Sequence, residues 1–249
     1  MFKIFIIIPI LFTFQFVTGQ GISDSSLFVP IITGNYSIQL PGGDLSERFG
    51  YNSCVGASFI LKTKSNIMFG LEAGYLFGNQ IKEDGILDSI RTSEGTILTK
   101  DGEAARIRLS ETGYLINIKA GKFFPILGPN PNCGLFILGS AGFLQHKIRI
   151  DVERNNVPSL YGDYIKGYDR LTNGLTVSEF VGYMFLNNRG TINFYFGFEF
   201  IQGFTQNRRD FNFDTMEKDD KKRNDFLNSF KVGWIFPLYK RAPQKYYMY

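Results

Sequence analysis

A two-residue alternation of apolar and polar positions runs through the C-terminal part of the chain. Between Ile192 and Phe204, one parity carries isoleucine or phenylalanine at every position except Gln202, and the other carries mostly small or polar residues. Successive side chains of a β-strand point to opposite faces, so the segment predicts a strand with one apolar face. A helix would scatter the rings around its circumference. A continuous aromatic face is typical of a strand that faces lipid.

Similar alternation elsewhere predicts eight strands, which we expect at 27–40, 51–62, 67–78, 112–124, 135–152, 175–185, 191–205 and 226–238. The connections 63–66, 125–134 and 187–190 are short, whereas 79–111, 153–174 and 206–225 are long and charged. Short turns at one end and long loops at the other are typical of outer-membrane barrels. The sequence therefore predicts an all-β fold, a single transmembrane antiparallel β-barrel with long extracellular loops and both termini in the periplasm.

Two other architectures fit parts of the pattern. A soluble β-sandwich or lipocalin-like barrel would carry its apolar face inward. The face opposite the aromatic residues, however, combines many glycines with charged residues, which suits a narrow lumen better than a soluble surface. A ten-strand barrel would require an extra hairpin from 86–91 and 96–100. We interpret these two segments as an extension of the strands at 67–78 and 112–124 above the membrane, because they carry charges on both parities.

The N-terminus predicts export. Lys3 precedes an apolar run from Ile4 to Val17, and Gly19 offers a cleavage site. The run is too short for a membrane anchor and has no flanking stop-transfer charges. We expect residues 1–19 to be a cleaved signal peptide, residues 20–240 to be the outer-membrane barrel and residues 241–249 to be a short periplasmic tail.

The composition agrees with a barrel that is apolar outside and polar inside. The chain has 26 Phe and 13 Tyr against one Trp and one His, yet its mean hydropathy is only −0.07. The net charge of +4 is mild. No basic stripe is interleaved with aromatic residues, so we expect no nucleic-acid partner. Cys54 and Cys133 fall at opposite ends of the predicted barrel, and we expect both to be free thiols.

Charged residues on the inward parity are candidates for the lumen: Glu72, Lys119, Glu199 and Lys231, with Glu179 as a further candidate. An eight-strand interior is only wide enough for side chains to fill. Unpaired charges there would be costly, so we expect ion pairs that plug the lumen. The alternative interpretation is a gate or a selectivity ring.

Two groups of aromatic and basic residues are candidates for contacts outside the lumen. Expected interface aromatics, each directly after a glycine, are Tyr75, Tyr114, Tyr183 and Trp234. Tyrosine and arginine are favoured at protein interfaces. The candidate partner contacts in the long loops and the tail are Tyr161, Tyr164, Tyr168, Arg170, Arg208, Arg209, Tyr246 and Tyr247.

Catalytic chemistry has little support in the sequence. Hydrolytic sites typically pair a nucleophile with a histidine base that a carboxylate orients. His146 shares a face with Ile148 and Ile150, and no serine or aspartate pattern lies near it, so we expect an interfacial or packed histidine. One histidine and two separated cysteines make zinc improbable, and the acidic loop 206–225 lacks the spacing of a calcium loop. We predict no catalytic, cofactor-binding or metal-binding residues.

The chain also has a family resemblance. It rests on glycine–aromatic pairs at 113–114, 182–183 and 233–234 and on the short sequence segments 128–132, 145–150 and 168–174. The chain resembles the eight-stranded outer-membrane barrels of the Bacteroidota, which include the OmpA/OmpX-like class and the PorT-like group associated with type IX secretion. The resemblance covers about residues 27–238 and transfers no catalytic residue. One departure is that residues 240–245 separate the last strand from the terminal aromatic residues.

Together these observations predict a non-enzymatic outer-membrane barrel, either a structural or a partner-binding component of the envelope. An accessory subunit of a type IX secretion or outer-membrane assembly machine is the form that the resemblance suggests. A small passive pore and a lipid-modifying enzyme are the alternatives. The expected partners are outer-membrane lipid, lipopolysaccharide and other envelope proteins, without a cofactor.

Overall fold

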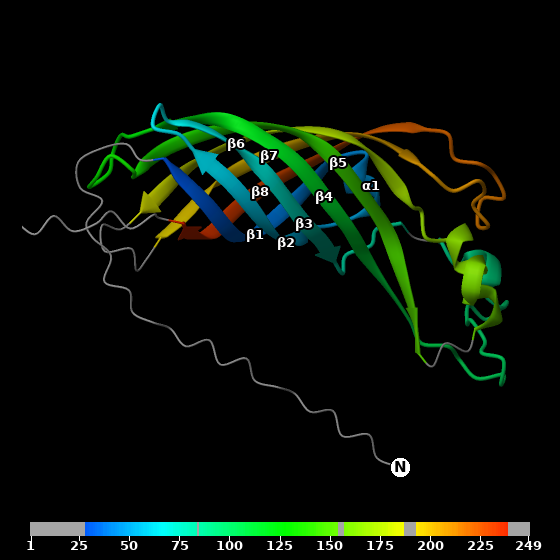
Figure 1. Ribbon diagram of the computed structural model, residues 1–249. Helices are drawn as coiled ribbons and strands as arrows, with labels where there is room; N and C mark the ends of the chain where they lie inside the picture. Colours follow the sequence, from blue (N-terminus) through cyan, green and yellow to red (C-terminus); the bar gives the residue numbers. More distant parts are fainter. Residues whose placement is uncertain (1–27, 84, 154–156, 187–192, 239–249) are drawn as a thin grey trace, which may run out of the picture.

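The chain forms a closed antiparallel barrel whose eight strands follow one another in sequence order (Figure 1). The computed structural model describes residues 28–83, 85–153, 157–186 and 193–238. The strands are β1 (Val29–Gly43), β2 (Asn52–Lys62), β3 (Ile67–Gly78), β4 (Ile107–Phe124), β5 (Gly134–Val152), β6 (Thr172–Leu186), β7 (Asn193–Asn207) and β8 (Lys222–Pro237). Pairing of β1 with β8, from Ile31 opposite Pro237 to Gly43 opposite Asp225, closes the barrel. The predicted eight-strand barrel is confirmed.

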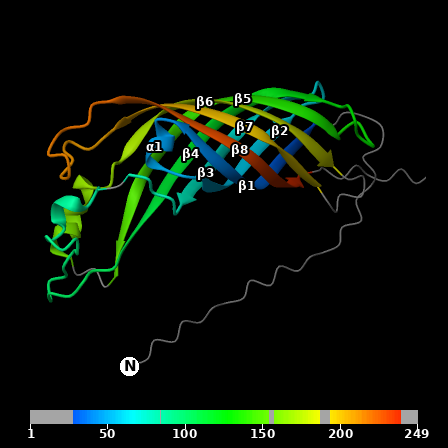
Figure 2. The same cartoon turned by 180° about the vertical axis from the view of Figure 1, so that it is seen from behind.

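The two ends of the barrel differ in the length of their connections. The short segments 63–66 and 125–133 lie at the turn end, on the left in Figure 1, where β1 begins and β8 ends. The connections 44–51, 79–106, 153–171 and 208–221 lie at the opposite, loop end, which Figure 2 shows from behind. The predicted turn 187–190, the signal peptide and the tail lie outside the described residues.

Short helical segments occur in the loop-end connections. They are α1 (Leu45–Arg48), η1 (Asp88–Ile90), η3 (Pro158–Leu160) and η4 (Gly162–Gly167). Within the described part of the chain, no helix is both long enough and apolar enough to cross a membrane.

Apolar side chains cover the outside of the barrel. On β7, Phe198 and Phe200 are 57% and 54% exposed, whereas Glu199 between them is fully buried. On β4, Ile118 is 67% exposed and its neighbour Lys119 is buried. Water would oppose such a surface, because each exposed ring costs hydration free energy. Hydrocarbon favours it, so the barrel has the inside-out distribution of a membrane-spanning protein.

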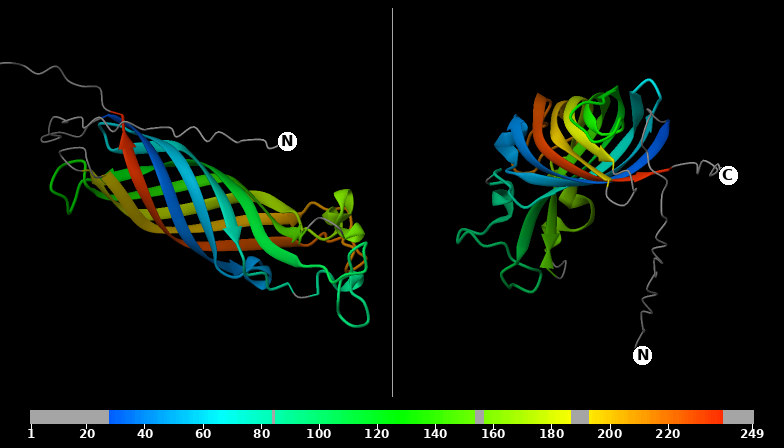
Figure 3. Two further views of the ribbon diagram at one scale, coloured as in Figure 1. Left: turned by 90° about the horizontal axis from the view of Figure 1, so that it is seen from below. Right: turned by 90° about the vertical axis from the view of Figure 1, so that its left-hand side faces the viewer.

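The hairpin of β4 and β5 extends beyond the rest of the barrel at the loop end (Figure 3). The last pair between β3 and β4 is Gly78 with Glu111, whereas β4 and β5 remain paired as far as Ile107 and Val152. The prediction that 86–91 and 96–100 extend the strands at 67–78 and 112–124 is therefore wrong. β3 ends at Gly78, β4 begins only at Ile107, and β5 rather than β3 continues alongside β4. Segment 86–91 contains η1, and 96–100 contributes only an isolated bridge, so neither adds a strand.

Both cysteines are free thiols, as predicted, and both are buried. Cys54 lies in β2 near the loop end, and Cys133 lies at the turn end directly before β5. The thiol of Cys133 donates to the backbone carbonyl of Leu186 at 3.2 Å. Their burial shields both thiols from reagents in solution.

We expect neither Cys54 nor Cys133 to react with a maleimide in the folded barrel, and both to react after unfolding in urea. Mass spectrometry of the labelled chain measures this directly. A Ser65→Cys variant is the matched control, because Ser65 is exposed in the turn between β2 and β3 and its thiol should label in both states. Rapid labelling of either native cysteine in the folded barrel would contradict the packing described above.

Candidate functional site

A ring of four charged residues crosses the barrel interior. Glu72 (β3), Lys119 (β4), Glu199 (β7) and Lys231 (β8), here called the charge ring, are all buried. Lys119 Nζ lies 2.9 Å from Glu72 Oε1 and 2.8 Å from Glu199 Oε1. Lys231 Nζ lies 2.7 Å from Glu72 Oε1 and also contacts Glu199. Each lysine thus contacts both glutamates, so the four charges sum to zero and none is left unpaired.

An aromatic layer fills the barrel between the charge ring and the turn end. The ring of Phe136 lies 5.0 Å from that of Phe180 and 5.8 Å from that of Tyr195. Two glycines make room for these rings: a Cβ at Gly197 would lie 2.6 Å from Phe180 Cζ, and one at Gly233 would lie 2.2 Å from Tyr195 Cε1. Thus part of the glycine content of the inward face serves to admit large rings.

A second apolar cluster fills the interior toward the loop end. Leu76, Leu115, Leu144, Ile201 and Leu227 converge there from five strands. The same cluster continues beyond the strands into the loop-end connections through residues such as Ile86, Leu87 and Leu160. Two apolar layers with the charge ring between them therefore pack the interior of the described barrel.

His146 on β5 points into this loop-end interior. Its Nε2 lies 3.1 Å from Asp225 Oδ2, and Thr205 Oγ1 donates to the same carboxylate oxygen at 2.5 Å. The prediction places His146 on an apolar face shared with Ile148 and Ile150. The structure shows that this face is the interior one, because all three side chains are buried. Sequence reasoning missed this constellation because its members come from three strands.

The constellation does not have the arrangement of a hydrolytic triad. In such a triad the imidazole contacts the nucleophile's hydroxyl group and the carboxylate orients the imidazole. Here the hydroxyl of Thr205 bonds to Asp225 rather than to His146. All three side chains are buried. The arrangement holds β5 against β7 and β8, and it offers no accessible nucleophile.

Glu179 does not belong to the lumen. Phe180 beside it is buried in the interior, while Glu179 itself is exposed on the outside of β6. The suggestion that Glu179 is a further lumen charge is therefore wrong. Its parity is that of Val177 and Val181, which face outward on the same strand.

The four expected interface aromatics lie on the outer surface near the two ends of the strands. Tyr75 and Tyr114 pair with each other across β3 and β4 toward the loop end. Tyr183 and Trp234 lie toward the turn end, and the hydroxyl of Tyr183 donates to the carbonyl of Leu127 at 2.7 Å. Contact with the lipid–water interface remains a prediction for all four residues.

The described residues of the connections 79–106, 153–171 and 208–221 pack together into what we call the loop platform. Arg170 anchors it: its Nε lies 2.6 Å from Glu83 Oε1, and its Nη2 contacts Asp214. Arg48 of α1 lies 3.1 Å from the other oxygen of Glu83. These contacts link α1 to loops that are distant in sequence, so partly buried charge pairs hold the platform together.

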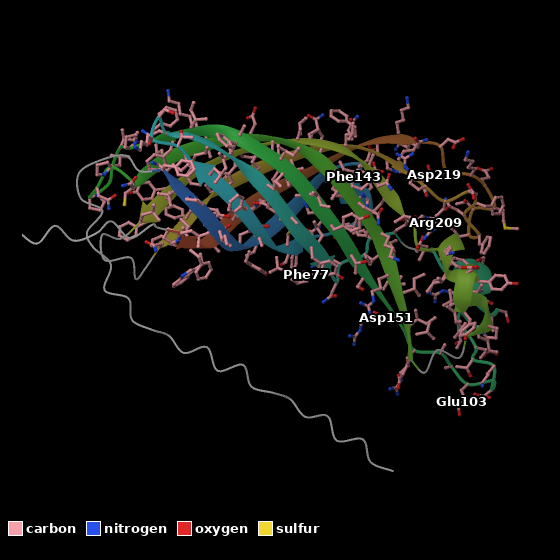
Figure 4. All side chains as sticks on the ribbon, viewed as in Figure 1. Phe77, Glu103, Phe143, Asp151, Arg209 and Asp219 are labelled. Atoms are coloured by element: carbon pink, nitrogen blue, oxygen red, sulfur yellow. The ribbon has the colours of Figure 1, made fainter. Side chains whose placement is uncertain are left out.

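Some of the residues predicted to contact a partner instead contact other residues of the loop platform. Tyr168 packs its ring 5.5 Å from Phe213, and Tyr168 and Arg170 are each only 4% exposed. Both residues therefore hold the platform together and are not available to a partner. Arg209 is partly buried and donates from Nε to Asp169 at 2.7 Å, whereas Arg208 is exposed. Figure 4 labels Arg209 at the loop end. Tyr246 and Tyr247 lie outside the described residues.

An electrostatic contact also fastens the beginning of α1 to the strand that closes the barrel. The backbone N–H of Asn224 donates to Asp44 Oδ2 at 2.7 Å, and Lys221 Nζ lies 3.1 Å from Asp44 Oδ1. The backbone hydrogen bond and, to a lesser degree, the lysine stabilise the charged carboxylate and lower the pKa of Asp44. Asp44 therefore remains ionised at neutral pH and keeps both contacts.

Two of the predicted contact tyrosines border a cleft on the outside of the loop platform. Tyr161 and Tyr164 are 62% and 64% exposed. They line a cleft of about 720 Å³ together with Val157, Phe213 and Lys100. Lys100 and Asp163 add one charge of each sign to the lining. An apolar cleft with aromatic walls is suited to binding an extended peptide or another apolar group. Within the described ranges, no group of acidic, histidine or cysteine side chains is arranged to hold a metal ion.

The chain was compared with family models, curated proteins and solved structures. No family model matches the chain, and no curated protein matches it. Similar solved structures include Neisserial surface protein A (10% identity, 83% of this chain and 95% of that chain, TM-score 0.45). A second is Ail, the attachment invasion locus protein of Yersinia pestis, with 10% identity over 87% of this chain and 99% of that chain and a TM-score of 0.36. A third is the outer membrane protein OprG from Pseudomonas aeruginosa, with 8% identity over 86% of this chain and 98% of that chain and a TM-score of 0.38. These similarities are too distant to assign a function.

Proposed function

We propose that the protein is a non-enzymatic barrel of the outer membrane that binds another envelope protein through its loop platform. The observation that carries this proposal is the contrast between the two parts of the molecule. The interior is packed with neutralised charges and apolar side chains, while the loops form an ordered surface with an aromatic cleft. In the orientation typical of outer-membrane barrels, the long loops face outward and the short turns face the periplasm. The proposal therefore places the loop platform outside the cell and both termini in the periplasm.

The two alternative functions have less support in the geometry. A passive pore requires a water-filled path, but two apolar layers and the charge ring occupy the lumen. A lipid-modifying enzyme requires an accessible base and nucleophile, whereas His146 is buried and its acidic partner binds the hydroxyl of Thr205. A surface that binds a partner requires neither feature.

The finer form of the proposal is an accessory subunit of a secretion machine, such as type IX, or of an outer-membrane assembly machine. The resemblance to PorT-like barrels supports the secretion machine, and the exposed tyrosines support a protein partner. Lipopolysaccharide surrounds the barrel in this setting, and its phosphates suit exposed basic residues such as Arg208. The aromatic tail at 246–249 is a second candidate contact on the periplasmic side.

Photocrosslinking in intact cells tests the partner-binding surface. A benzophenone amino acid at position 161 or 164 should give a discrete adduct with one envelope protein, identified by mass spectrometry. The same probe at position 51, where Tyr51 is exposed in the connection between α1 and β2 and outside the loop platform, is the control and should not give that adduct. The Tyr161→Ala/Tyr164→Ala variant should reduce recovery of the partner about tenfold or more, since exposed tyrosines are frequent hot spots. Absence of an adduct at both positions would remove the cleft from the proposal.

A second measurement separates the proposal from the passive pore. The purified full-length chain, inserted into a planar lipid bilayer, should show no stepwise conductance, because the lumen is packed. Stable single-channel currents from the wild-type chain would overturn the non-pore interpretation, whatever the crosslinking shows.

A further inference from the structure

A carboxylate lies on the lipid-facing surface of the barrel, midway along β6. Glu179 is exposed, and its outward neighbours on the same strand are apolar: Leu175 and Val177 toward the loop end, and Val181 and Tyr183 toward the turn end. It lies six residues from Asn173 and four from Tyr183, which at about 3.3 Å per residue is about 20 Å and 13 Å along the strand. Glu179 is therefore well inside the apolar belt.

The carboxylate of Glu179 has no partner in the described part of the chain. No hydrogen bond or ion pair connects it to another described residue, in contrast to the fully paired glutamates of the charge ring. A charged residue facing hydrocarbon destabilises a barrel, most strongly at the middle of the bilayer. Such residues usually mark functional contacts.

The two neighbouring strands leave free space on one side of Glu179 and place an aromatic ring on the other. Directly opposite it on β5 is Gly139, where a Cβ would meet only one neighbouring atom, at 3.9 Å. On its other side, Phe200 pairs with Glu179 and also with Asn228 on β8. Asn228 faces outward between Phe226 and Phe230 and is exposed. The carboxylate therefore lies beside a shallow, side-chain-free position on one flank and beside the ring of Phe200 on the other, while the amide of Asn228, one strand further, donates to the carbonyl of Leu40.

We propose that this face, centred on Glu179 over β5 to β8, docks a membrane-embedded segment of another protein that carries a basic side chain at the same depth. Charge complementarity selects this occupant, because an unpaired carboxylate in hydrocarbon gains most from a cation. The open position at Gly139 lets the partner's backbone approach. The inference goes beyond the loop-mediated function, since it places a contact within the membrane plane.

Lipid and a second copy of the chain fit this face less well. Acyl chains offer no donor, and lipid headgroups lie at the two edges of the apolar belt rather than in its middle. Two copies inserted in the same direction and related by a two-fold axis would meet through the same patch. Glu179 would then face the Glu179 of the partner, and like charges would repel each other.

Association with a designed transmembrane helix tests the proposal. The full-length barrel is reconstituted in phosphatidylcholine vesicles, and its folding is checked by heat-modifiable migration on a gel. The probe is a labelled leucine–alanine helix of about 20 residues with one central lysine, and the reference helix has leucine at that position. Energy transfer to a labelled barrel measures binding for the wild type, Glu179→Leu and the control Val55→Leu, which changes an outward residue of β2 outside the proposed face.

We expect the lysine helix to bind the wild type and Val55→Leu about tenfold more tightly than Glu179→Leu, and the leucine helix to show no difference. Glu179→Leu should fold, because leucine suits a lipid-facing position. Equal binding of the lysine helix to the wild type and Glu179→Leu would overturn the proposal. So would self-association of the barrel that depends on Glu179, because the occupant would then be a second copy. Neither result bears on the loop crosslinking experiment, so the two proposals fail separately.

Discussion

Replacing Glu199 with alanine should lower the free energy of unfolding by about 3–5 kcal/mol, the cost typical of breaking a buried ion pair. The substitution leaves Lys119 and Lys231 to share Glu72, so the interior carries an uncompensated positive charge. Urea unfolding in vesicles measures the change. Trp234 is the only tryptophan and lies on the outer surface, so its fluorescence reports transfer from lipid to water.

Two controls show whether charge balance causes this loss. Glu217→Ala removes an exposed loop carboxylate and should change stability by no more than about 0.5 kcal/mol. Glu199→Ala combined with Lys231→Met restores neutrality and should recover a large part of the loss, because Lys119 keeps its contact with Glu72. If Glu199→Ala alone costs less than the surface control, the charge ring does not contribute to stability as described.

Replacing Phe136 with alanine should cost about 3–5 kcal/mol, because the substitution leaves a cavity in the aromatic layer. Phe136 is buried and contacts the rings of both Phe180 and Tyr195. The same urea titration measures the effect. The loss has two parts, the transfer free energy of the ring and the contacts that the neighbouring rings no longer make.

Phe198→Ala is the matched control for the cavity. Phe198 faces outward and is 57% exposed, so lipid can fill the space that its ring leaves. The expected loss is smaller, about 1.5–3 kcal/mol. It consists of the transfer term and the contact with the ring of Phe230, whose centroid lies 5.4 Å away. Equal losses for Phe136→Ala and Phe198→Ala would indicate that the interior layer is loosely packed.

Much of the barrel could be predicted because the period-two pattern directly encodes which side chains face out. The outward phenylalanines of β7 and the inward Glu199 follow from their parity alone. Glu179 shares the parity of Val177 and Val181, so the same rule, applied strictly, would have placed it outside. For this residue, parity predicts the orientation of the side chain better than its charge does.

Other features depend on which strands meet, which a single sequence does not reveal. His146 and Asp225 are 79 residues apart, and their contact requires the register of several strand pairs. Tyr168 and Arg170 have a composition typical of a binding surface, yet packing between loops buries them. The composition of a loop therefore identified Tyr161 and Tyr164 as exposed candidates but could not separate them from the two residues that hold the loops together.

The charge ring also constrains the order in which the barrel can assemble. Its four members come from β3, β4, β7 and β8, and Glu72 and Lys231 are 159 residues apart. The charges of the ring are fully neutralised only when β8, which carries Lys231, has joined the sheet. An earlier partial sheet would therefore carry unpaired charges into the bilayer. Long-range pairing of this kind forms slowly, because chain entropy is lost before the contacts form. The charges should therefore stay hydrated until closure, and insertion and closure should occur as one kinetic step rather than hairpin by hairpin.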